Sequence, residues 1–243
     1  MATLFVSDVH LCAERPAAVE AFLSFIDGPA RRADAVYLLG DIFDQWLGDD
    51  DDTAPHTDVL AAFSRLTNSG VPVGLFHGNH DFLVGHSFGE RSGCQVLGDS
   101  SVTELGTTQA LITHGDALCT DDTEYQAFRR LSRDPENQAR LLSLPMSARK
   151  QQAVELRKHS RAAKQLKPAD IMDVNHDAVA SAMRERNVRL LIHGHTHRPA
   201  THEFELDGQP AQRIVLGDWY ESDHVLVWDT NGFRAGAVRE MLP

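Results

Sequence analysis

The sequence contains little cysteine, and no two cysteines form a motif. Its 243 residues include only Cys12, Cys94 and Cys119, with no C-x-x-C pair. Disulfide frameworks use more cysteines and persist in oxidising compartments. We therefore expect a protein of a reducing compartment without a disulfide framework.

Long apolar runs and linkers are also missing. No run approaches the roughly 18 apolar residues of a membrane span. The N-terminal stretch becomes acidic at Asp8, too early for a signal peptide. No repeat and no Pro/Gly/Ser-rich linker divides the chain, and this length suits one α/β domain with a sizeable core. We expect one domain, 1–243, in the cytoplasm, soluble or attached to a membrane only at its surface.

The chain as a whole has no excess of positive charge. Its formal net charge of −12 argues against general nucleic-acid binding. The charge is uneven, because residues 129–167 carry eleven Lys/Arg and three Asp/Glu. That segment is therefore +8, which leaves −20 for the remainder of the −12 total. A basic segment on an acidic body suits an anionic membrane surface, so we expect a peripheral membrane contact and no nucleic-acid partner.

The sequence does contain apolar, strand-like runs that end in metal-binding side chains. The run 35–39 stops at Gly40-Asp41. A carboxylate at the carboxyl end of a buried strand lies where open α/β folds place their ligands, and glycine allows a close approach. The same arrangement recurs at Asp8-Val9-His10, Gly78-Asn79-His80-Asp81, His114-Gly115-Asp116 and His193-Gly194-His195-Thr196-His197.

These endings predict one metal site. Asp, His and Asn suit Mn²⁺, Fe²⁺ or Zn²⁺, whereas an all-oxygen site would suit Mg²⁺ or Ca²⁺. Two ions about 3.5–4 Å apart can clamp the oxygens of a phosphoryl displacement, and a shared Asp41 fits that arrangement. The i, i+2 spacing of Asp8 and His10 predicts side chains on one side of an extended backbone. The seven candidate ligands are Asp8, His10, Asp41, Asn79, His114, His195 and His197.

The other patterns predict an α/β body with a helical insertion. Helical periodicity between buried runs implies parallel strands, and apolar alternation with turns predicts antiparallel strands near the C-terminus. Residues 121–168 look helical without intervening strands, which predicts an inserted cap. We expect the acidic loop 48–52 to be solvated rather than ligating. The expected strands are 4–6, 35–39, 71–76, 94–97, 102–105, 110–112 and 190–192, and the expected helices of the body are 17–26, 59–66 and 174–183.

The ordered motifs D-x-H, G-D-x-x-D, G-N-H-D, H-G-D and G-H-T-H resemble those of the calcineurin-like metallophosphoesterases. The resemblance implies an α/β four-layer sandwich, in which two mixed β-sheets are flanked by helices. It also implies a two-ion site in which one carboxylate is shared. One ion would be held by Asp8, His10, Asp41 and His197, and the other by Asp41, Asn79, His114 and His195.

Longer stretches resemble one branch of that superfamily, the UDP-2,3-diacylglucosamine pyrophosphohydrolases of lipid A synthesis. They run from Glu14–Pro16 through Gly40–Asp50 and His114–Asp122 to Ile192–Ala200 and Ile214–Trp219. The resemblance implies that water attacks the α-phosphorus, giving UMP and 2,3-diacylglucosamine 1-phosphate. It further implies a Mn²⁺ cofactor, a monomer, and a position on the cytoplasmic face of the inner membrane.

The same resemblance assigns roles to individual residues. Asp41, Asn79, His80, His114 and His195 would be catalytic. Substrate contacts are implied at Asn79, His80, Asp122, Ser160, Lys164, Lys167 and His195.

The predicted cap agrees with a lipid-linked pyrophosphate. Arg157, Ser160, Lys164 and Lys167 are spaced to share one helix face, and a cationic stripe suits a pyrophosphate. A solvated helix face and ordinary helix packing are the alternatives. The apolar residues that could line an acyl-chain groove are Leu141, Leu142, Leu144, Met146, Val154 and Leu156.

One residue departs from the branch, which usually has arginine where this chain has His80. A departing sugar phosphate needs charge stabilisation, whereas histidine can protonate a poorer alkoxide leaving group. An alternative is therefore a broader nucleotide or protein phosphoesterase that uses His80 as a general acid. A third hypothesis, a membrane-binding module with an inactive site, conflicts with the complete ligand set.

Overall fold

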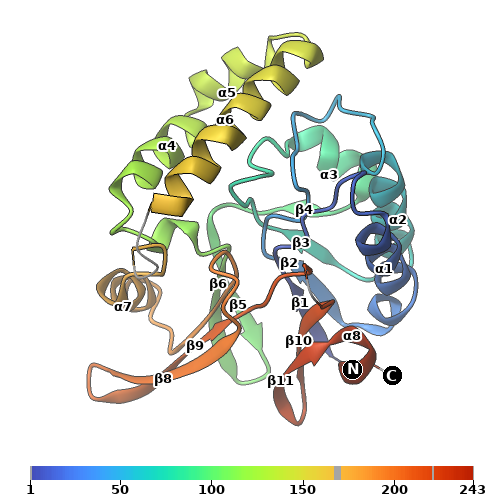
Figure 1. Ribbon diagram of the computed structural model, residues 1–243. Coiled ribbons are helices and arrows are strands. Elements are labelled where there is room, and N and C mark those ends of the chain that lie inside the picture. Colours follow the sequence, from blue (N-terminus) through green and yellow to red (C-terminus); the bar gives the residue numbers. More distant parts are fainter. Residues whose placement is uncertain (1, 167–170, 221, 243) are drawn as a thin grey trace.

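The computed structural model describes residues 2–166, 171–220 and 222–242, with the backbone alone for 159–166. Two β-sheets pack face to face, and helices cover the outer face of each (Figure 1). The predicted four-layer sandwich of two mixed sheets is therefore confirmed. The helices are α1 (Pro16–Asp27), α2 (His56–Asn68), α3 (His86–Ser92), α4 (Thr123–Arg133), α5 (Pro135–Leu142), α6 (Met146–Leu166), α7 (His176–Glu185) and α8 (Val238–Met241).

The first sheet has the strand order β11-β10-β1-β2-β3-β4. The four strands β1 to β4 are parallel, and β10 and β11 add an antiparallel edge. Helices α1 to α3 cover its outer face (Figure 1). Its strands are β1 (Thr3–Val6), β2 (Ala35–Leu38), β3 (Val73–Leu75), β4 (Gln95–Val96), β10 (His224–Asp229) and β11 (Gly232–Ala237).

The second sheet has the order β5-β6-β7-β9-β8, with α7 against its outer face. Strands β6, β7 and β9 are parallel, whereas β5 and β8 are antiparallel edges. The C-terminal antiparallel prediction thus holds for the β8–β9 and β10–β11 hairpins and is wrong for β9 against β7. These strands are β5 (Ser100–Leu105), β6 (Thr108–Thr113), β7 (Leu190–His193), β8 (Ala200–Leu206) and β9 (Gln209–Val215).

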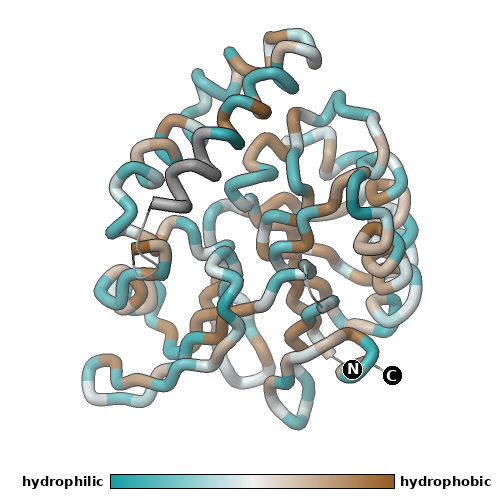
Figure 2. The backbone as a smooth tube through the Cα atoms, viewed as in Figure 1, coloured by the Kyte–Doolittle hydropathy of each residue, from teal (hydrophilic) through white to brown (hydrophobic). Residues whose placement is uncertain are grey.

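Alternation along the central strands fills the spaces between the layers. In β1, Leu4 and Val6 join the core under α1 to α3, whereas Phe5 points into the space between the sheets. In β7, Ile192 faces the space between the sheets and Leu191 faces α7. Both faces of these strands are buried, which explains their continuous apolar sequences. Figure 2 accordingly shows mostly hydrophobic residues along the strands inside the sandwich.

Helices α4 to α6 stand together beside the sandwich (Figure 1), and no strand interrupts the described chain from Thr123 to Leu166. Asp122 caps α4 by accepting from the Tyr125 backbone N–H, and Asp134 caps α5 in the same way. No helix in the described part of the chain combines the length and apolar character of a membrane span.

The acidic loop after β2 differs from the solvated loop we expected. Asp49 accepts from the indole of Trp46 and from the backbone N–H groups of Gly85 and Phe88. Asp51 is 3% exposed. The prediction was wrong for Asp49 and Asp51, whose carboxylates organise the loop and the start of α3, and is confirmed for Asp50 and Asp52, which are exposed.

Candidate metal centre

The candidate site lies where the carboxyl ends of five strands from both sheets meet. Strands β1, β2 and β3 deliver the motifs around Asp8, Asp41 and Asn79, and β6 and β7 deliver those around His114 and His195. Three groups of side chains have ligand atoms within 4.8 Å of one another: Asp8, His10 and His197; Asp41, His114 and His195; and His10, Asp41 and His80.

Several of these residues have a left-handed backbone, including Asp8 (φ 56°), His10 (φ 52°) and Asp41 (φ 53°). The extended backbone predicted for Asp8 to His10 was therefore wrong. Residues other than glycine seldom adopt a positive φ, and the surrounding structure must hold them there at a cost in free energy. Here the Asp8 and His10 N–H groups donate to the Gly40 and Asp41 carbonyls at 3.1 and 3.0 Å.

Two glycines are required by close approach. A Cβ on Gly194 would lie 1.9 Å from Ser7 Oγ, and one on Gly78 would lie 2.1 Å from Asp41 Oδ1. No side chain fits at either position, because such contacts are far inside van der Waals separation. Glycine at these two positions therefore allows the ligand loops of different strands to touch.

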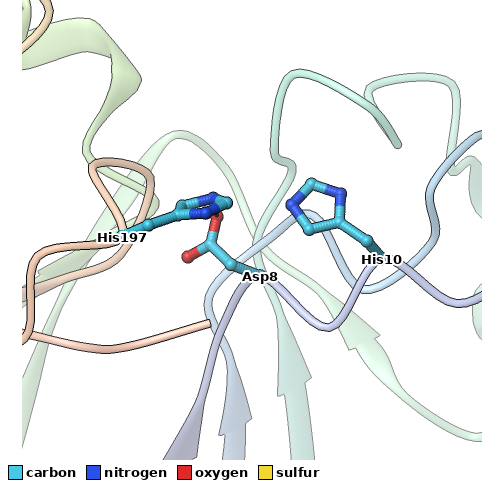
Figure 3. A group of neighbouring side chains, drawn as sticks. All are labelled: Asp8, His10 and His197. Carbon is cyan, nitrogen blue, oxygen red and sulfur yellow. Dashed lines mark ion pairs between the residues drawn. The ribbon is translucent and has the colours of Figure 1, made fainter. Parts of the chain in front are cut away.

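In the first group, His197 faces the carboxylate of Asp8 while His10 points in from the opposite side (Figure 3). His197 Nε2 lies 3.2 Å from Asp8 Oδ1. The other oxygen of Asp8 accepts from Ser7 Oγ at 2.5 Å and from the His195 N–H at 2.9 Å. Asp8 is fully buried, so its orientation is fixed from both sides.

In the second group, His114 lies between Asp41 and Asn79. Its Nε2 is 3.7 Å from Asp41 Oδ2 and 3.2 Å from Asn79 Oδ1. Its Nδ1 is 2.7 Å from the Leu39 carbonyl, which can only accept, so Nδ1 carries the hydrogen. In neutral His114 the Nε2 lone pair therefore faces the group. His195 Nδ1 completes it, 3.2 Å from His114 Nε2.

His80 is oriented by the loop after β2. Its Nδ1 donates to the Asp44 carbonyl at 2.8 Å, so Nε2 points toward Asp41 Oδ2, 4.0 Å away. His10 Nε2 lies 3.9 Å from the same oxygen. Asp41 Oδ2 thus lies near three rings, those of His10, His80 and His114, as a shared carboxylate would.

Burial and neighbouring charges set the protonation of these groups. Burial raises the pKa of Asp41, against the attraction of His80 and His114. Burial opposes ionisation of Asp8, but the nearby His197 and the charge of His114 outweigh it and lower its pKa. Burial and the charge of His80 hold the pKa of His10 well below its ordinary value, so His10 is neutral and able to act as a ligand.

The donor set fits a divalent cation. Both ring nitrogens of His10 and the Oδ1 atom of Asp8 are buried without a hydrogen bond among the described residues. Buried polar atoms are nearly always satisfied, and an orphan of this kind calls for an explanation such as an ion. Mixed carboxylate, amide and imidazole donors match the preferences of Mn²⁺, Fe²⁺ or Zn²⁺.

Two aspartates support the site without belonging to the predicted set. Asp81 accepts from the Gly78 N–H at 2.7 Å and the Ile42 N–H at 2.8 Å, which joins the loops after β3 and β2. Asp116 accepts from Tyr125 Oη at 2.7 Å. Both aspartates belong to motifs that the sequence analysis identified, but their supporting roles could not be predicted, because hydrogen-bond partners such as Ile42 and Tyr125 lie elsewhere in the chain.

Of the predicted substrate contacts, Asp122 caps α4, and Arg157 donates to the Asp44 carbonyl at 2.6 Å and to its carboxylate. The side chains of Ser160 and Lys164, and the whole of Lys167, lie outside the described residues. Leu142, Val154 and Leu156 are 40%, 49% and 47% exposed on the cap, as is Leu131 at 62%.

The fold and site together define a calcineurin-like phosphoesterase. The family model of the calcineurin-like phosphoesterases matches residues 1–199, and the chain belongs to this family. Curated relatives include a UDP-2,3-diacylglucosamine hydrolase of Escherichia coli O157:H7, which is 50% identical over 90% of this chain and 92% of its own length. Another, of Pseudomonas paraeruginosa, has the same name and is 49% identical over 96% and 98%. Among solved structures, the E. coli phosphoesterase Yfce is 16% identical, covering 99% of this chain and 94% of its own, with a TM-score of 0.49.

Proposed function

We propose that this protein hydrolyses the pyrophosphate of UDP-2,3-diacylglucosamine to UMP and 2,3-diacylglucosamine 1-phosphate, a step of lipid A biosynthesis. The observation that carries this proposal is the convergence of seven candidate ligands from five strand ends, next to a basic helical segment whose Arg157 contacts the loop after β2. Identity near 50% to curated hydrolases of this substrate, over almost the whole chain, supports it.

The proposed ligand sets share Asp41. One set consists of Asp8, His10, Asp41 and His197, and the other of Asp41, Asn79, His114 and His195. We propose Mn²⁺ for both, because the mixed nitrogen and oxygen donors admit it and the resemblance to the pyrophosphohydrolases implies it. Two bound ions would supply positive charge for the phosphates and lower the pKa of a water molecule for attack on the α-phosphorus.

Among the residues that the structure describes, His80 is well placed to meet the leaving phosphate. Its ring is fixed by the Asp44 carbonyl, its Nε2 faces the site, and it is 27% exposed. A sugar phosphate leaves as an anion, so a cationic or hydrogen-bonding group beside it suffices. Arg157 is held close by, on Asp44, where a pyrophosphate could take over its interaction.

The segment 121–168 is proposed as an inserted cap that receives the lipid. Exposed Leu142, Val154 and Leu156 on α5 and α6 offer apolar surface for acyl chains. The net charge of +8 in residues 129–167 suits an anionic membrane surface. We accordingly propose a monomer that works at the cytoplasmic face of the inner membrane, bound peripherally.

One comparison tests the proposal. Purified protein with added Mn²⁺ is assayed on UDP-2,3-diacylglucosamine and on bis(p-nitrophenyl) phosphate. The proposal predicts far higher kcat/KM for the lipid nucleotide. The orientation of His80 toward the site also suits a general acid, so a preference for aryl or alkyl phosphodiesters would favour the broader phosphoesterase instead.

A further inference from the structure

Asp218 lies outside the predicted ligand set but touches one member of it. It follows β9, in the stretch Gly217-Asp218-Trp219. Its Oδ2 is 2.8 Å from His197 Nδ1, and its Oδ1 accepts from the Tyr220 backbone N–H at 3.0 Å. The carboxylate is thus held by the backbone at one oxygen and directed at the His197 ring with the other.

This contact decides which nitrogen of His197 can act as a ligand. An ionised carboxylate only accepts hydrogen bonds, so Nδ1 of His197 carries the hydrogen. The lone pair of the neutral ring is then on Nε2, the atom 3.2 Å from Asp8 Oδ1. Nε2 is therefore the nitrogen available to an ion that Asp8 and His10 also contact.

The segment that carries Asp218 is fixed to the same ligand loop. The Trp219 N–H donates to the Asp8 carbonyl at 3.1 Å, and its indole donates to the His224 carbonyl at 2.9 Å. The Arg15 guanidinium donates to the Trp219 carbonyl at 2.5 Å and lies 4.4 Å over the Tyr220 ring. The distance between Asp218 and the Asp8 loop is therefore set by the Trp219 N–H and by Arg15, which also donates to the Val9 carbonyl at 3.0 Å.

We propose that Asp218 is a positioning residue, which fixes the tautomer and orientation of His197 and so tightens binding of the ion at Asp8, His10 and His197. The inference rests on the proposed function, since it takes His197 as a ligand. Carboxylates that accept from the second nitrogen of a ligating histidine commonly change metal affinity by about 10–100-fold when they are removed.

The test measures metal affinity rather than turnover. The full-length protein is stripped of metal and titrated with Mn²⁺, followed by calorimetry and by the EPR signal of free Mn²⁺. We expect Asp218→Ala to weaken one of the two ions by about 10–100-fold and to leave the other within about twofold. Asp218→Asn keeps an oxygen acceptor without the charge and should fall in between.

Asp223→Asn is the matched control, because Asp223 lies on the same segment and its described hydrogen bond to Val238 uses the backbone carbonyl. It should bind both ions as the wild type does. Thermal unfolding of the metal-free variants checks that each is folded, and Asp218→Asn carries the test if the alanine variant does not fold.

A double-mutant cycle tests whether Asp218 acts on the ion through His197. In a His197→Ala background, adding Asp218→Ala should weaken the ion no further, because Asp218 acts through that ring. An equal loss in both backgrounds, or wild-type affinities in Asp218→Ala alone, would overturn the positioning role while leaving the proposed function in place. If His197→Ala itself left both affinities unchanged, His197 would not be a ligand, and both the proposed ligand set and this inference would fail.

Discussion

At the scale of single residues, Asp41 has the most demanding position in the site. It is 2% exposed and left-handed, and its Oδ2 lies within 4.0 Å of the nitrogens of His10, His80 and His114. Its Oδ1 accepts from the His80 N–H at 2.8 Å. One carboxylate thus connects both proposed ligand sets and the residue beside the leaving group.

Asp41→Ala should therefore abolish turnover and weaken both ions. We expect a loss of at least about a thousandfold in kcat, equivalent to about 4 kcal/mol of transition-state stabilisation. The measurement is kcat together with the content of bound Mn²⁺, and Asp58→Ala on the exposed face of α2 is the control. Two tightly bound ions with normal turnover would contradict the shared-carboxylate arrangement.

His80→Arg restores the residue usual in the resembling branch. Because the proposed leaving group is already a phosphate anion, charge stabilisation by arginine should serve about as well as histidine. We expect substantial activity on UDP-2,3-diacylglucosamine and a much larger loss on diesters with alkoxide leaving groups, both measured as kcat/KM. A similar large loss of both activities, with Mn²⁺ still bound, would point to a native leaving group that needs a proton.

Which residues meet at the site could be predicted from sequence, because strand ends with ligand side chains are a local pattern. The left-handed backbone of Asp8 and His10 could not, since spacing alone suggested an extended chain. The contact between Asp218 and His197 joins two loops about twenty residues apart, and that between Arg157 and Asp44 joins the cap to the body. Such contacts depend on how the elements pack against one another, and a local sequence pattern does not predict that packing.

At the scale of elements, α6 is fastened to the loop after β2 by two arginines two turns apart. Arg149 donates to both oxygens of Asp50, at 2.7 and 2.5 Å, and to the Leu47 carbonyl at 2.7 Å. Arg157 reaches Asp44, further along the same helix. The cap is therefore coupled to the loop that follows Asp41.

Arg149→Ala should loosen the cap and impair use of the lipid substrate. Arg149 is 4% exposed, and its guanidinium also donates to the Leu144 carbonyl at 2.9 Å, so water cannot replace its fork geometry at all four contacts. We expect faster amide hydrogen exchange in α5 and α6 and a KM for the lipid nucleotide raised about tenfold, with both ions retained. Lys150→Ala, next to it and exposed, is the control, and equal exchange rates in the two variants would show that the contact does not hold the cap.

Some helices and strands could be predicted from the sequence more readily than others. Both faces of β1 and β7 are buried, and β2 buries one face fully and the other in part, so the apolar runs of all three strands were recognisable in the sequence. Helix α3 was missed, because its seven residues bury only Phe88 and Ser92 and contain no full apolar period. Its start is organised from outside by Asp49, in the acidic loop whose structural role also escaped the sequence analysis.

At the scale of the whole molecule, the second sheet contains a buried pair formed by His193 of β7 and Arg213 of β9. Arg213 Nη1 donates to His193 Nε2 at 3.1 Å, while His193 Nδ1 donates to the Gly194 carbonyl at 2.8 Å. Burial, with a smaller effect of Arg213, lowers the pKa of His193 to about 4. The folded protein therefore keeps this ring neutral.

The consequence is a specific loss of stability in acid. Between pH 6.5 and about 4, His193 is protonated in the unfolded chain and neutral in the folded chain. The free energy of unfolding therefore falls as pH falls through that window, by up to about 3 kcal/mol. His193→Gln, which keeps an acceptor for Arg213, should lack this part of the slope in urea titrations of metal-free protein, and identical slopes would contradict the assignment.

The most direct test of the proposed function follows the oxygen of the attacking water. Mn²⁺-loaded protein is incubated with UDP-2,3-diacylglucosamine in ¹⁸O-water, and the ¹⁸O content of both products is measured by mass spectrometry. Attack at the α-phosphorus predicts one ¹⁸O in UMP and none in 2,3-diacylglucosamine 1-phosphate. Label in the sugar phosphate, or no turnover of this substrate by protein that cleaves aryl phosphodiesters, would contradict the account.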